Sequence, residues 1–307
     1  MRGAADSFGI VTNFYFRTHP TPGRVVHIDL GFDNLLVNVA DAVAVFQHIQ
    51  KFAQDPYSID RRLTLSIRFS GSLGLSVMGV YMGTLWQLGD EALPKLVGGL
   101  PVTPSSSSTE EVSWLRSLVL LSGSKELEVP QTKGPPSQDN FFTKSVTTNG
   151  PFSAETLASY FQYVKDKGPS APTAWDAIIN LHGGFDSQIT AQDAGSSAYP
   201  ERSALWIVQH YAYVAAGRTF PQEGFEFVEG LNEAMTRHMP RFGACANYVD
   251  PTLSRDEAQE LYYGTELVRR LKDIKDVVDP GNVFSNPHSI EPSRQTVRET
   301  QEEELEE

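Results

Sequence analysis

The stretch that decides the fold runs from Cys245 to Ile290. It reads CANYVD at residues 245–250, ELYYGTELVRRL at residues 260–271 and DPGNVFSNPHSI at residues 279–290. The first piece predicts a short strand that sets the Asn247 amide beside the Tyr248 phenol. The second piece has the apolar spacing of an amphipathic helix, and the third predicts a rigid turn built on proline and glycine. We expect this stretch to pack against the glycine-containing start of the chain, Arg2–Val11.

The length and the net charge of the chain limit the kinds of protein that it can be. At 307 residues the chain is long enough for one large domain or two ordinary ones. Its formal net charge of −13 argues against nucleic-acid binding, because a phosphate backbone would repel it. Part of that charge lies in residues 291–307, which hold seven Glu and two Arg and predict a disordered acidic tail.

Cysteine usage and hydropathy bear on the compartment. Cys245 is the one cysteine, so no intrachain disulfide can form. No apolar run approaches the roughly 18 residues that span a bilayer, so we expect no membrane segment. The first six residues lack the apolar core of a signal peptide, and the sequence leaves the cellular location open.

Between residues 25 and 238 the hydrophobic pattern switches between the periods of strands and helices. Strands are predicted at residues 25–30, 63–69, 75–83, 175–181 and 205–214, and helices at 37–52, 90–97, 153–167 and 222–238. Residues 114–121 fit a buried strand or a helix, and a further strand is expected over residues 7–16. Residues 105–108 and 130–140 predict loops. This order predicts an α+β fold, a large antiparallel sheet covered by helices on one face.

The common catalytic signatures of hydrolases, zinc enzymes and nucleoside triphosphatases do not occur in the sequence. Its seven histidines are scattered, and none pairs with another at metal-ligand spacing, so no metal site is predicted. His48 falls in a predicted helix and suits a boundary position. His182 precedes two glycines and suits a turn better than catalysis.

Three polar side chains remain as candidates for chemistry. Gln209 lies in a predicted strand on an otherwise apolar face, where a buried amide needs either a ligand or a hydrogen bond across the sheet. Tyr248 follows Asn247 at the end of an apolar segment and fits either proton relay or plain packing. Asn180 lies two residues before His182 and is a weaker candidate for the same cavity.

Several pieces of the sequence form a recognisable set. The chain begins with RGAADSFGIVT at residues 2–12, continues with FTKS at 142–145 and YPER at 199–202, and closes with NYVD at 247–250, YYG at 262–264 and DPGNVFSNPHSI at 279–290. From residue 2 to residue 290 this set resembles berberine-bridge-enzyme-like FAD-linked oxidases. These belong to the vanillyl-alcohol-oxidase superfamily and include fungal oligosaccharide oxidases.

The resemblance implies how the chain is divided. Residues 1–18 would be the end of a PCMH-type FAD-binding domain, and residues 19–240 the substrate-binding α+β domain. Residues 241–290 would form a berberine-bridge-type segment that returns to the FAD domain, before the tail at 291–307. Most of the FAD-binding domain would be missing, and with it the His and Cys that commonly bond to the flavin.

The resemblance also implies site residues. Gln209 would lie beside the substrate, with Tyr248 as the second polar participant. Asn180 would stand in place of an acidic residue that assists a tyrosine, so that assistance by charge would be lost. The residues expected to contact the FAD are Gly3, Ser7, Phe8, Gly9, Ile10, Asn247 and Asn282.

Three positions depart from the family pattern. Cys245 occupies a position where relatives usually carry a tyrosine placed over the flavin. Glu201 replaces a common His and Ser203 a common Asp, and we expect both to be changes in a surface turn. The loss of the tyrosine leaves the acid–base assignment to the remaining candidates.

The resemblance therefore implies an FAD-dependent oxidoreductase acting on a sugar, a secondary metabolite or another small molecule. In such enzymes a hydride passes to the flavin, a side chain takes the substrate proton, and O2 reoxidises the flavin. We expect a monomer with no nucleic-acid or membrane partner. The alternative is a catalytically inactive remnant or binding module without FAD, which the missing FAD-binding domain would favour.

Overall fold

A computed structural model describes residues 2–123, 126–127 and 139–293 of the chain. These residues form two compact units. Unit 1 comprises residues up to Arg17, Gln192–Pro200 and the segment from Val249 onward, and unit 2 comprises Thr18–Ala191 and Glu201–Tyr248. The predicted acidic tail, apart from its first three residues, and most of the predicted loop at 130–140 lie outside the described residues.

Unit 2 is built on a seven-stranded sheet in which every neighbouring pair is antiparallel, as predicted. The strand order is β4-β1-β3-β2-β6-β7-β5. The strands are β1 (Arg24–Phe32), β2 (Leu63–Ser70), β3 (Leu75–Tyr81), β4 (Ser106–Ser113), β5 (Asn140–Thr148), β6 (Ala174–Leu181) and β7 (Trp206–Val214). The helices are α1 (Val39–Gln54), α2 (Leu85–Gln87), α3 (Leu93–Val97), α4 (Trp114–Leu121), α5 (Ala154–Lys167) and α6 (Gln222–Thr236), with a π-helical turn at Leu88–Ala92 between α2 and α3.

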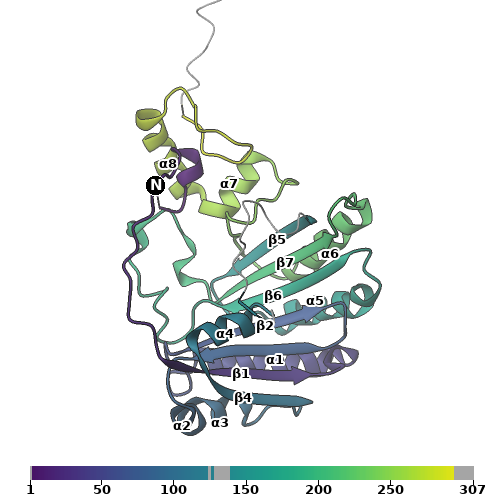
Figure 1. Ribbon diagram of the computed structural model, residues 1–307. Coiled ribbons are helices and arrows are strands. Elements are labelled where there is room, and N and C mark those ends of the chain that lie inside the picture. Colours follow the sequence, from purple (N-terminus) through teal and green to yellow (C-terminus); the bar gives the residue numbers. More distant parts are fainter. Residues whose placement is uncertain (1, 124–125, 128–138, 294–307) are drawn as a thin grey trace, which may run out of the picture. The chain divides into compact units, whose positions relative to one another are not determined.

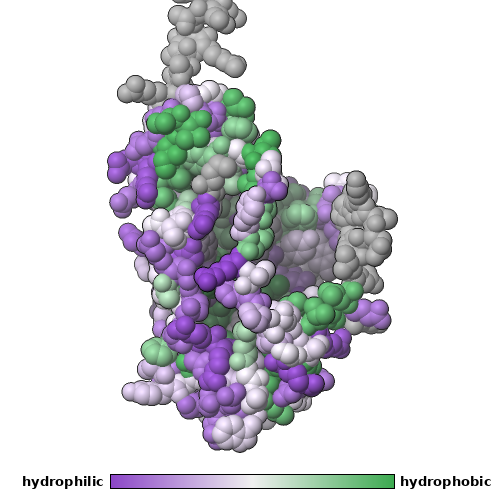
Figure 2. Space-filling view, turned by 60° about the vertical axis from the view of Figure 1, so that its left-hand side comes forward, coloured by the Kyte–Doolittle hydropathy of each residue, from purple (hydrophilic) through white to green (hydrophobic). Residues whose placement is uncertain are grey.

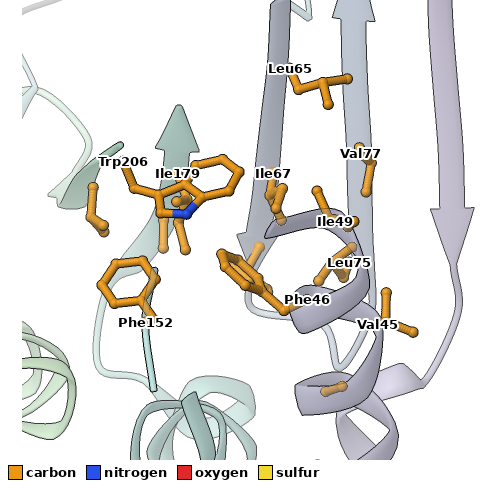
Figure 3. Close-up of a cluster of buried hydrophobic side chains, with 14 of the residues drawn as sticks. Val45, Phe46, Ile49, Leu65, Ile67, Leu75, Val77, Phe152, Ile179 and Trp206 are labelled. Carbon is orange, nitrogen blue, oxygen red and sulfur yellow. The ribbon is translucent and has the colours of Figure 1, made fainter. Parts of the chain in front are cut away.

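The main hydrophobic core lies between one face of this sheet and the helices α1, α5 and α6 (Figure 1). Phe46 of α1 packs on Trp206 of β7 with ring centroids 5.5 Å apart, and both side chains are fully buried. Val45, Ile49 and Phe46 project from α1 toward the strands that carry Ile67 and Val77 (Figure 3). Burying each large apolar side chain contributes on the order of 1.5–3 kcal/mol, so this layer sets the position of the sheet.

A buried amide joins three elements of this layer. Gln50 of α1 accepts from the Phe152 backbone N–H at 2.6 Å and donates to the Phe152 carbonyl at 3.1 Å. Its oxygen also accepts from the Trp206 indole at 3.1 Å. Because both the amide and its partners are satisfied, this polar group is tolerated in the core and fixes α1 against β7 and the start of α5.

Helix boundaries follow their predicted signals, but three assignments in unit 2 were wrong or incomplete. Ser153 caps α5, as predicted, by accepting from the Thr156 N–H. The expected loop at 105–108 belongs instead to the edge strand β4, and β5 was not recognised. The ambiguous stretch 114–121 is the helix α4. It packs on the sheet face opposite the main core, near Val25 and Val80, so helices do not lie on one face alone.

Unit 1 contains helices α7 (Arg255–Tyr263) and α8 (Thr265–Val278) and the first residues of the chain. A capping box at Ser254 and Glu257 begins α7. The predicted packing of the start of the chain on the C-terminal segment is confirmed, because the Ile290 N–H donates to the Ser7 hydroxyl at 3.0 Å. Two predicted strands are absent, since residues 7–16 and 245–250 form turns and irregular backbone.

The fully buried Lys275 ammonium holds unit 1 together. It donates to the carbonyls of Ser7 at 2.5 Å and Phe284 at 2.7 Å, and to the Asp279 carboxylate at 2.7 Å. Asp279 also accepts from the backbone N–H groups of Val283 and Phe284, each at 2.9 Å. All three ammonium donors therefore have acceptors, which is the condition for a charge to be buried. The hydrogen bond from Lys275 lowers the pKa of Asp279 to about 2, with the two backbone donors adding to the effect.

Candidate functional site

The candidate site lies on the sheet face of unit 2 that points away from the main core. In the strand register Gln209 of β7 stands opposite Ser145 of β5 and Ile178 of β6. Residues opposite one another point to the same face of a sheet, and so do residues two apart along a strand. Gln209 is half-buried, whereas its neighbours Val208 and His210 point into the core and are fully buried, as the predicted alternation requires.

The Tyr248 phenol and the Gln209 amide meet on this face. The Tyr248 hydroxyl donates to Gln209 Oε1 at 3.1 Å. The segment that carries Tyr248 is tied to the edge strand β5 at two points: Gly243 and Thr147 exchange two backbone hydrogen bonds, and the Cys245 N–H donates to the Ser145 hydroxyl at 2.8 Å. The strand register of β5 and β7 therefore sets where the phenol lies.

The hydrogen bond determines what the pair can do chemically. Because the phenol donates to Gln209, a ligand hydroxyl can hydrogen-bond to the phenol only as a donor to its oxygen. Burial raises the pKa of Tyr248, and the neighbouring Cys245 thiol raises it further. A phenol in this state is neutral near pH 7, so it can orient or relay a proton but does not retain one.

Asn180 lies on the same face but is not held in the pair. It stands opposite Ile207 of β7 and Ser66 of β2, and its side chain is exposed. The diagonal spacing from Asn180 to Gln209 is about 7–8 Å between backbone positions. The structure thus brings Tyr248 and Gln209 into contact and sets Asn180 at the rim of the same polar surface.

The structure shows the surroundings of the two histidines. His48 is half-buried in α1 and its ring contacts the Leu96 carbonyl at 2.9 Å. His182 directly follows β6, and its backbone N–H donates to the Leu205 carbonyl at 2.9 Å. Within the described ranges no group of three or more His, Cys, Asp or Glu side chains is arranged to hold a metal ion.

Sequence reasoning missed the hydroxyl row of β5. Ser145 and Thr147 lie on the same face as Gln209 and are both buried. The signal was present in FFTKSVTT at residues 141–148, whose β-branched and aromatic residues are typical of strands. The loop-like composition just before it obscured the start of the strand.

The cofactor candidates Ser7, Phe8 and Gly9 belong to unit 1, where their backbone donors are already used. The Ser7 N–H bonds to the Ala4 carbonyl, and the N–H groups of Phe8 and Gly9 both bond to the Ala5 carbonyl. The Ser7 hydroxyl and carbonyl are occupied by Ile290 and Lys275. This turn therefore presents no row of free N–H groups of the kind that binds a diphosphate.

The other cofactor candidates have different surroundings. Gly3 has φ +89° and approaches the Ala198 backbone so closely that an added Cβ would be 2.9 Å from its carbonyl carbon. Ile10 is 78% exposed, and Asn247 is also exposed. Asn282 takes the left-handed conformation within the turn that Asp279 organises. Gly3 and Asn282 thus shape the backbone of unit 1, while Ile10 and Asn247 are free to meet another surface.

Unit 1 also contains a hollow of about 500 Å³. Two guanidinium groups and several apolar side chains of α8 line it, a combination that fits a ligand or segment that is anionic at one end and apolar at the other. Figure 2 shows hydrophobic surface gathered on unit 1. The lining residues are Arg2, Ala4, Phe8, residues 195–198, Leu267, Arg270, Leu271, Ile274 and Val278.

Comparison with known proteins agrees with the resemblance to berberine-bridge-enzyme-like oxidases. Residues 244–291 match the family model described as "Berberine and berberine like". The chain is 29% identical over 297 residues to a chitooligosaccharide oxidase of Gibberella zeae. The aligned region covers 95% of this chain and 57% of the relative.

Solved structures agree with the sequence comparison. A xylooligosaccharide oxidase of Myceliophthora thermophila in complex with xylobiose superposes with a TM-score of 0.83 at 26% identity, over 95% of this chain and 60% of that one. A glucooligosaccharide oxidase of Acremonium strictum whose FAD is a 6-S-cysteinyl, 8α-N1-histidyl derivative superposes with a TM-score of 0.77 at 26% identity, over 90% and 57%.

The matched region spans less than two thirds of each relative. The chain covers 57–60% of the length of these relatives. Nearly all of this chain therefore has a counterpart in them, whereas about two fifths of each relative has none in this chain. No helix among the described residues is both long enough and apolar enough to cross a membrane.

Proposed function

We propose that this chain, a relative of the FAD-linked oligosaccharide oxidases, carries the substrate face and C-terminal part of an FAD-linked oxidoreductase. Its substrate would present a hydroxyl group on a sugar or a sugar-like small molecule. The proposal rests on the Tyr248–Gln209 hydrogen bond, which sets a neutral phenol on a polar, partly open sheet face. The similarity to three oligosaccharide oxidases favours this function over that of a binding module.

The residues of this chain would act mainly by binding and orienting the substrate. A substrate hydroxyl would donate to the Tyr248 oxygen, while Gln209 fixes the direction of the phenol. Asn180, exposed two positions along the same face, offers a donor and an acceptor to a neighbouring hydroxyl. Bound FAD would supply the two-electron acceptor, and O2 would restore its oxidised form.

The described residues fit only part of an FAD molecule. Within unit 1, the hollow lined by Arg2 and Arg270 suits an anionic group, and Ile10 is exposed. In unit 2, Asn247 is exposed and offers an amide to a ligand. The N–H groups of residues 7–9 are already hydrogen-bonded within unit 1, so this turn does not form a diphosphate site. We therefore assign the diphosphate to the part of the relatives that this chain does not span.

The test is to supply that part. The N-terminal portion of the Gibberella zeae relative without a counterpart here would be joined to residue 1, giving a protein that we call the joined protein. We expect the joined protein to be yellow, and its flavin to be bleached anaerobically by at least one oligosaccharide from a panel. The same N-terminal portion expressed alone is the control for flavin binding.

Two outcomes would count against the proposal. A folded joined protein that binds no flavin would remove the cofactor assignment. A yellow protein whose flavin is reduced by dithionite but by none of the saccharides, alcohols or polyols offered would remove the proposed chemistry. Formation of H2O2 in step with substrate oxidation would test O2 as the acceptor.

A further inference from the structure

Glu201 is a carboxylate that lies beside Thr147, at one end of the β5 hydroxyl row. It was expected to be a surface turn change, but it is half-buried, whereas Ser203 is exposed as expected. A Cβ built on Gly243 would lie 2.5 Å from Glu201 Oε1 and 2.7 Å from Thr147 Oγ1. The carboxylate and the Thr147 hydroxyl thus share the space beside Gly243, and that space exists because residue 243 is a glycine.

Thr147 connects this carboxylate to the site. Its hydroxyl is buried and has no well-aligned hydrogen bond, although it lies close enough to the carboxylate to affect its pKa. Thr147 and Ser145 point to the same face of β5, roughly 7 Å apart along the strand. Ser145 stands opposite Gln209. The spacing between Ser145 and Thr147 is too long for a direct hydrogen bond between the two hydroxyls, so a link along this face from the Tyr248–Gln209 pair to Glu201 needs water between them.

The chemistry of the pair makes such a group necessary. Oxidation of a hydroxyl releases one hydride and one proton, and the proton needs an acceptor. Amides such as Gln209 and Asn180 do not retain a proton near neutral pH, and Tyr248 is already a protonated phenol. A half-buried carboxylate within the same unit can retain one.

We propose that Glu201 is the proton acceptor of the Tyr248–Gln209 site, reached through water molecules hydrogen-bonded along the hydroxyls of Ser145 and Thr147. This inference rests on the proposed function. In the balanced step, the substrate C–H bond breaks and its hydride reduces the FAD, while the O–H proton passes to Tyr248 as the phenol proton moves on toward Glu201. The carbonyl product, reduced flavin and a protonated Glu201 carboxyl result.

The charge around Glu201 is compatible with this role. Burial raises the pKa of Glu201, and the nearby Thr147 hydroxyl offsets part of the rise. The ionisable groups on the elements around it are Arg202 beside it in the chain, His182, whose pKa Arg202 lowers after the larger effect of burial, and Cys245 and Tyr248 on the segment after Gly243. No ion pair of Glu201 is present among the described residues.

The test uses the full chain without FAD or substrate. Carboxyl and tyrosine ring carbons would be labelled with 13C and followed by NMR from pH 3.5 to 8. We expect the Glu201 carboxyl to titrate above the ordinary glutamate value of about 4.3, and the Tyr248 ring to show a step at the same midpoint. In Glu201→Gln both signals should be lost together.

Two further variants separate coupling from general damage. Asp176→Asn removes the carboxylate on β6 that shares the same face, opposite Tyr211, and should leave the Tyr248 step in place. Gly243→Ala should displace both the Glu201 carboxylate and the Thr147 hydroxyl, and so shift the Glu201 midpoint and weaken the Tyr248 step. Unchanged dispersion of the methyl spectrum would verify the fold in each variant.

These NMR measurements test the role of Glu201 separately from the proposed oxidoreductase function. A Tyr248 ring that shows no step, or keeps the step in Glu201→Gln, would overturn the role of Glu201. Transfer of the effect to Asp176→Asn would overturn it in favour of Asp176. If the coupling is present but the joined protein oxidises nothing, the proposed function fails while the link between Glu201 and Tyr248 stands.

Discussion

At the scale of single residues, the proposed chemistry depends most on the phenol of Tyr248. In the joined protein, Tyr248→Phe should slow flavin reduction by about 100-fold, because the substrate hydroxyl loses the oxygen that accepts its proton. The ring and its packing remain, so flavin content should not change. Stopped-flow measurement of flavin bleaching under saturating substrate gives the rate.

The matched control is Tyr57→Phe, which removes a hydroxyl from a tyrosine that is 83% exposed. Its flavin-reduction rate should stay within error of the parent. Equal rates for the parent and Tyr248→Phe would remove Tyr248 from proton transfer. If flavin reduction is slow in both variants, the cause is a difference in flavin occupancy between preparations, and the measurement is repeated at matched occupancy.

His210 is a second residue with a measurable consequence. Its ring is fully buried, neither ring nitrogen has a hydrogen-bond partner among the residues that the structure describes, and it stands opposite Lys144. Burial lowers the pKa of His210 to about 3, and the Lys144 charge adds to the effect. The folded state therefore favours the neutral ring, while the unfolded chain binds a proton near pH 6.5.

The sign of the pH dependence follows from this difference. The stability contributed by neutral His210 is fully present above pH 6.5 and is lost as the pH falls from 6.5 toward 3. Urea unfolding between pH 7.5 and 4.5 should show the parent losing up to about 1.4 kcal/mol per pH unit relative to His210→Leu. His238→Gln, at an exposed position, is the control. Parallel pH profiles for the parent and His210→Leu would contradict the prediction.

At the scale of elements, the buried Lys275 explains why the DPGNVF turn follows α8 so closely. Lys275→Met removes the donor for three acceptors, one at Ser7 and two in the turn, and should destabilise unit 1 by about 3–5 kcal/mol. The half-buried Lys272 lies on the same helix, and Lys272→Met should cost less than about 0.5 kcal/mol. Urea unfolding followed by circular dichroism measures both.

A loss of the same small size in the two lysine variants would show that the Lys275 contacts add no net stability. A large loss only in Lys275→Met would support its role as the joint between α8, residues 5–8 and the turn. The predicted contact between the two ends of the chain would then have an energetic basis as well as a geometric one.

Elements with a strong internal pattern were the ones that sequence reasoning found. The spacing in α1, the Ser153 cap of α5 and the alternation of β2 and β7 each reflect burial on one side of a regular backbone. β4 was missed because SSSTEEVS carries little apolar signal at a sheet edge. The strand expected at 245–250 is absent because those residues lie on β5 through one bridge and one side-chain bond, which requires no strand.

At the scale of the whole molecule, flavin binding should depend on the part of the relatives that this chain does not span. The chain alone should be colourless, and adding FAD should leave its melting temperature unchanged within about 1 °C, because a ligand that does not bind the folded state adds no stability. The joined protein should melt higher with FAD than without it. Differential scanning fluorimetry compares the two, and a clear rise for the chain alone would contradict the assignment of the diphosphate site.

The sequence by itself determined most of the helices and strands and the resemblance to FAD-linked oxidases. Periodicity and short motifs are local, so α1, β7 and the turn at 279–284 could be inferred from the residues within them. The tertiary structure decided which side chains meet. Tyr248 reaches Gln209 across 39 positions, Lys275 reaches Ser7 across 268, and Glu201 shares a space with Thr147 because Gly243 bridges β5 there. Such contacts depend on strand register and helix packing, which side chains distant in sequence settle together.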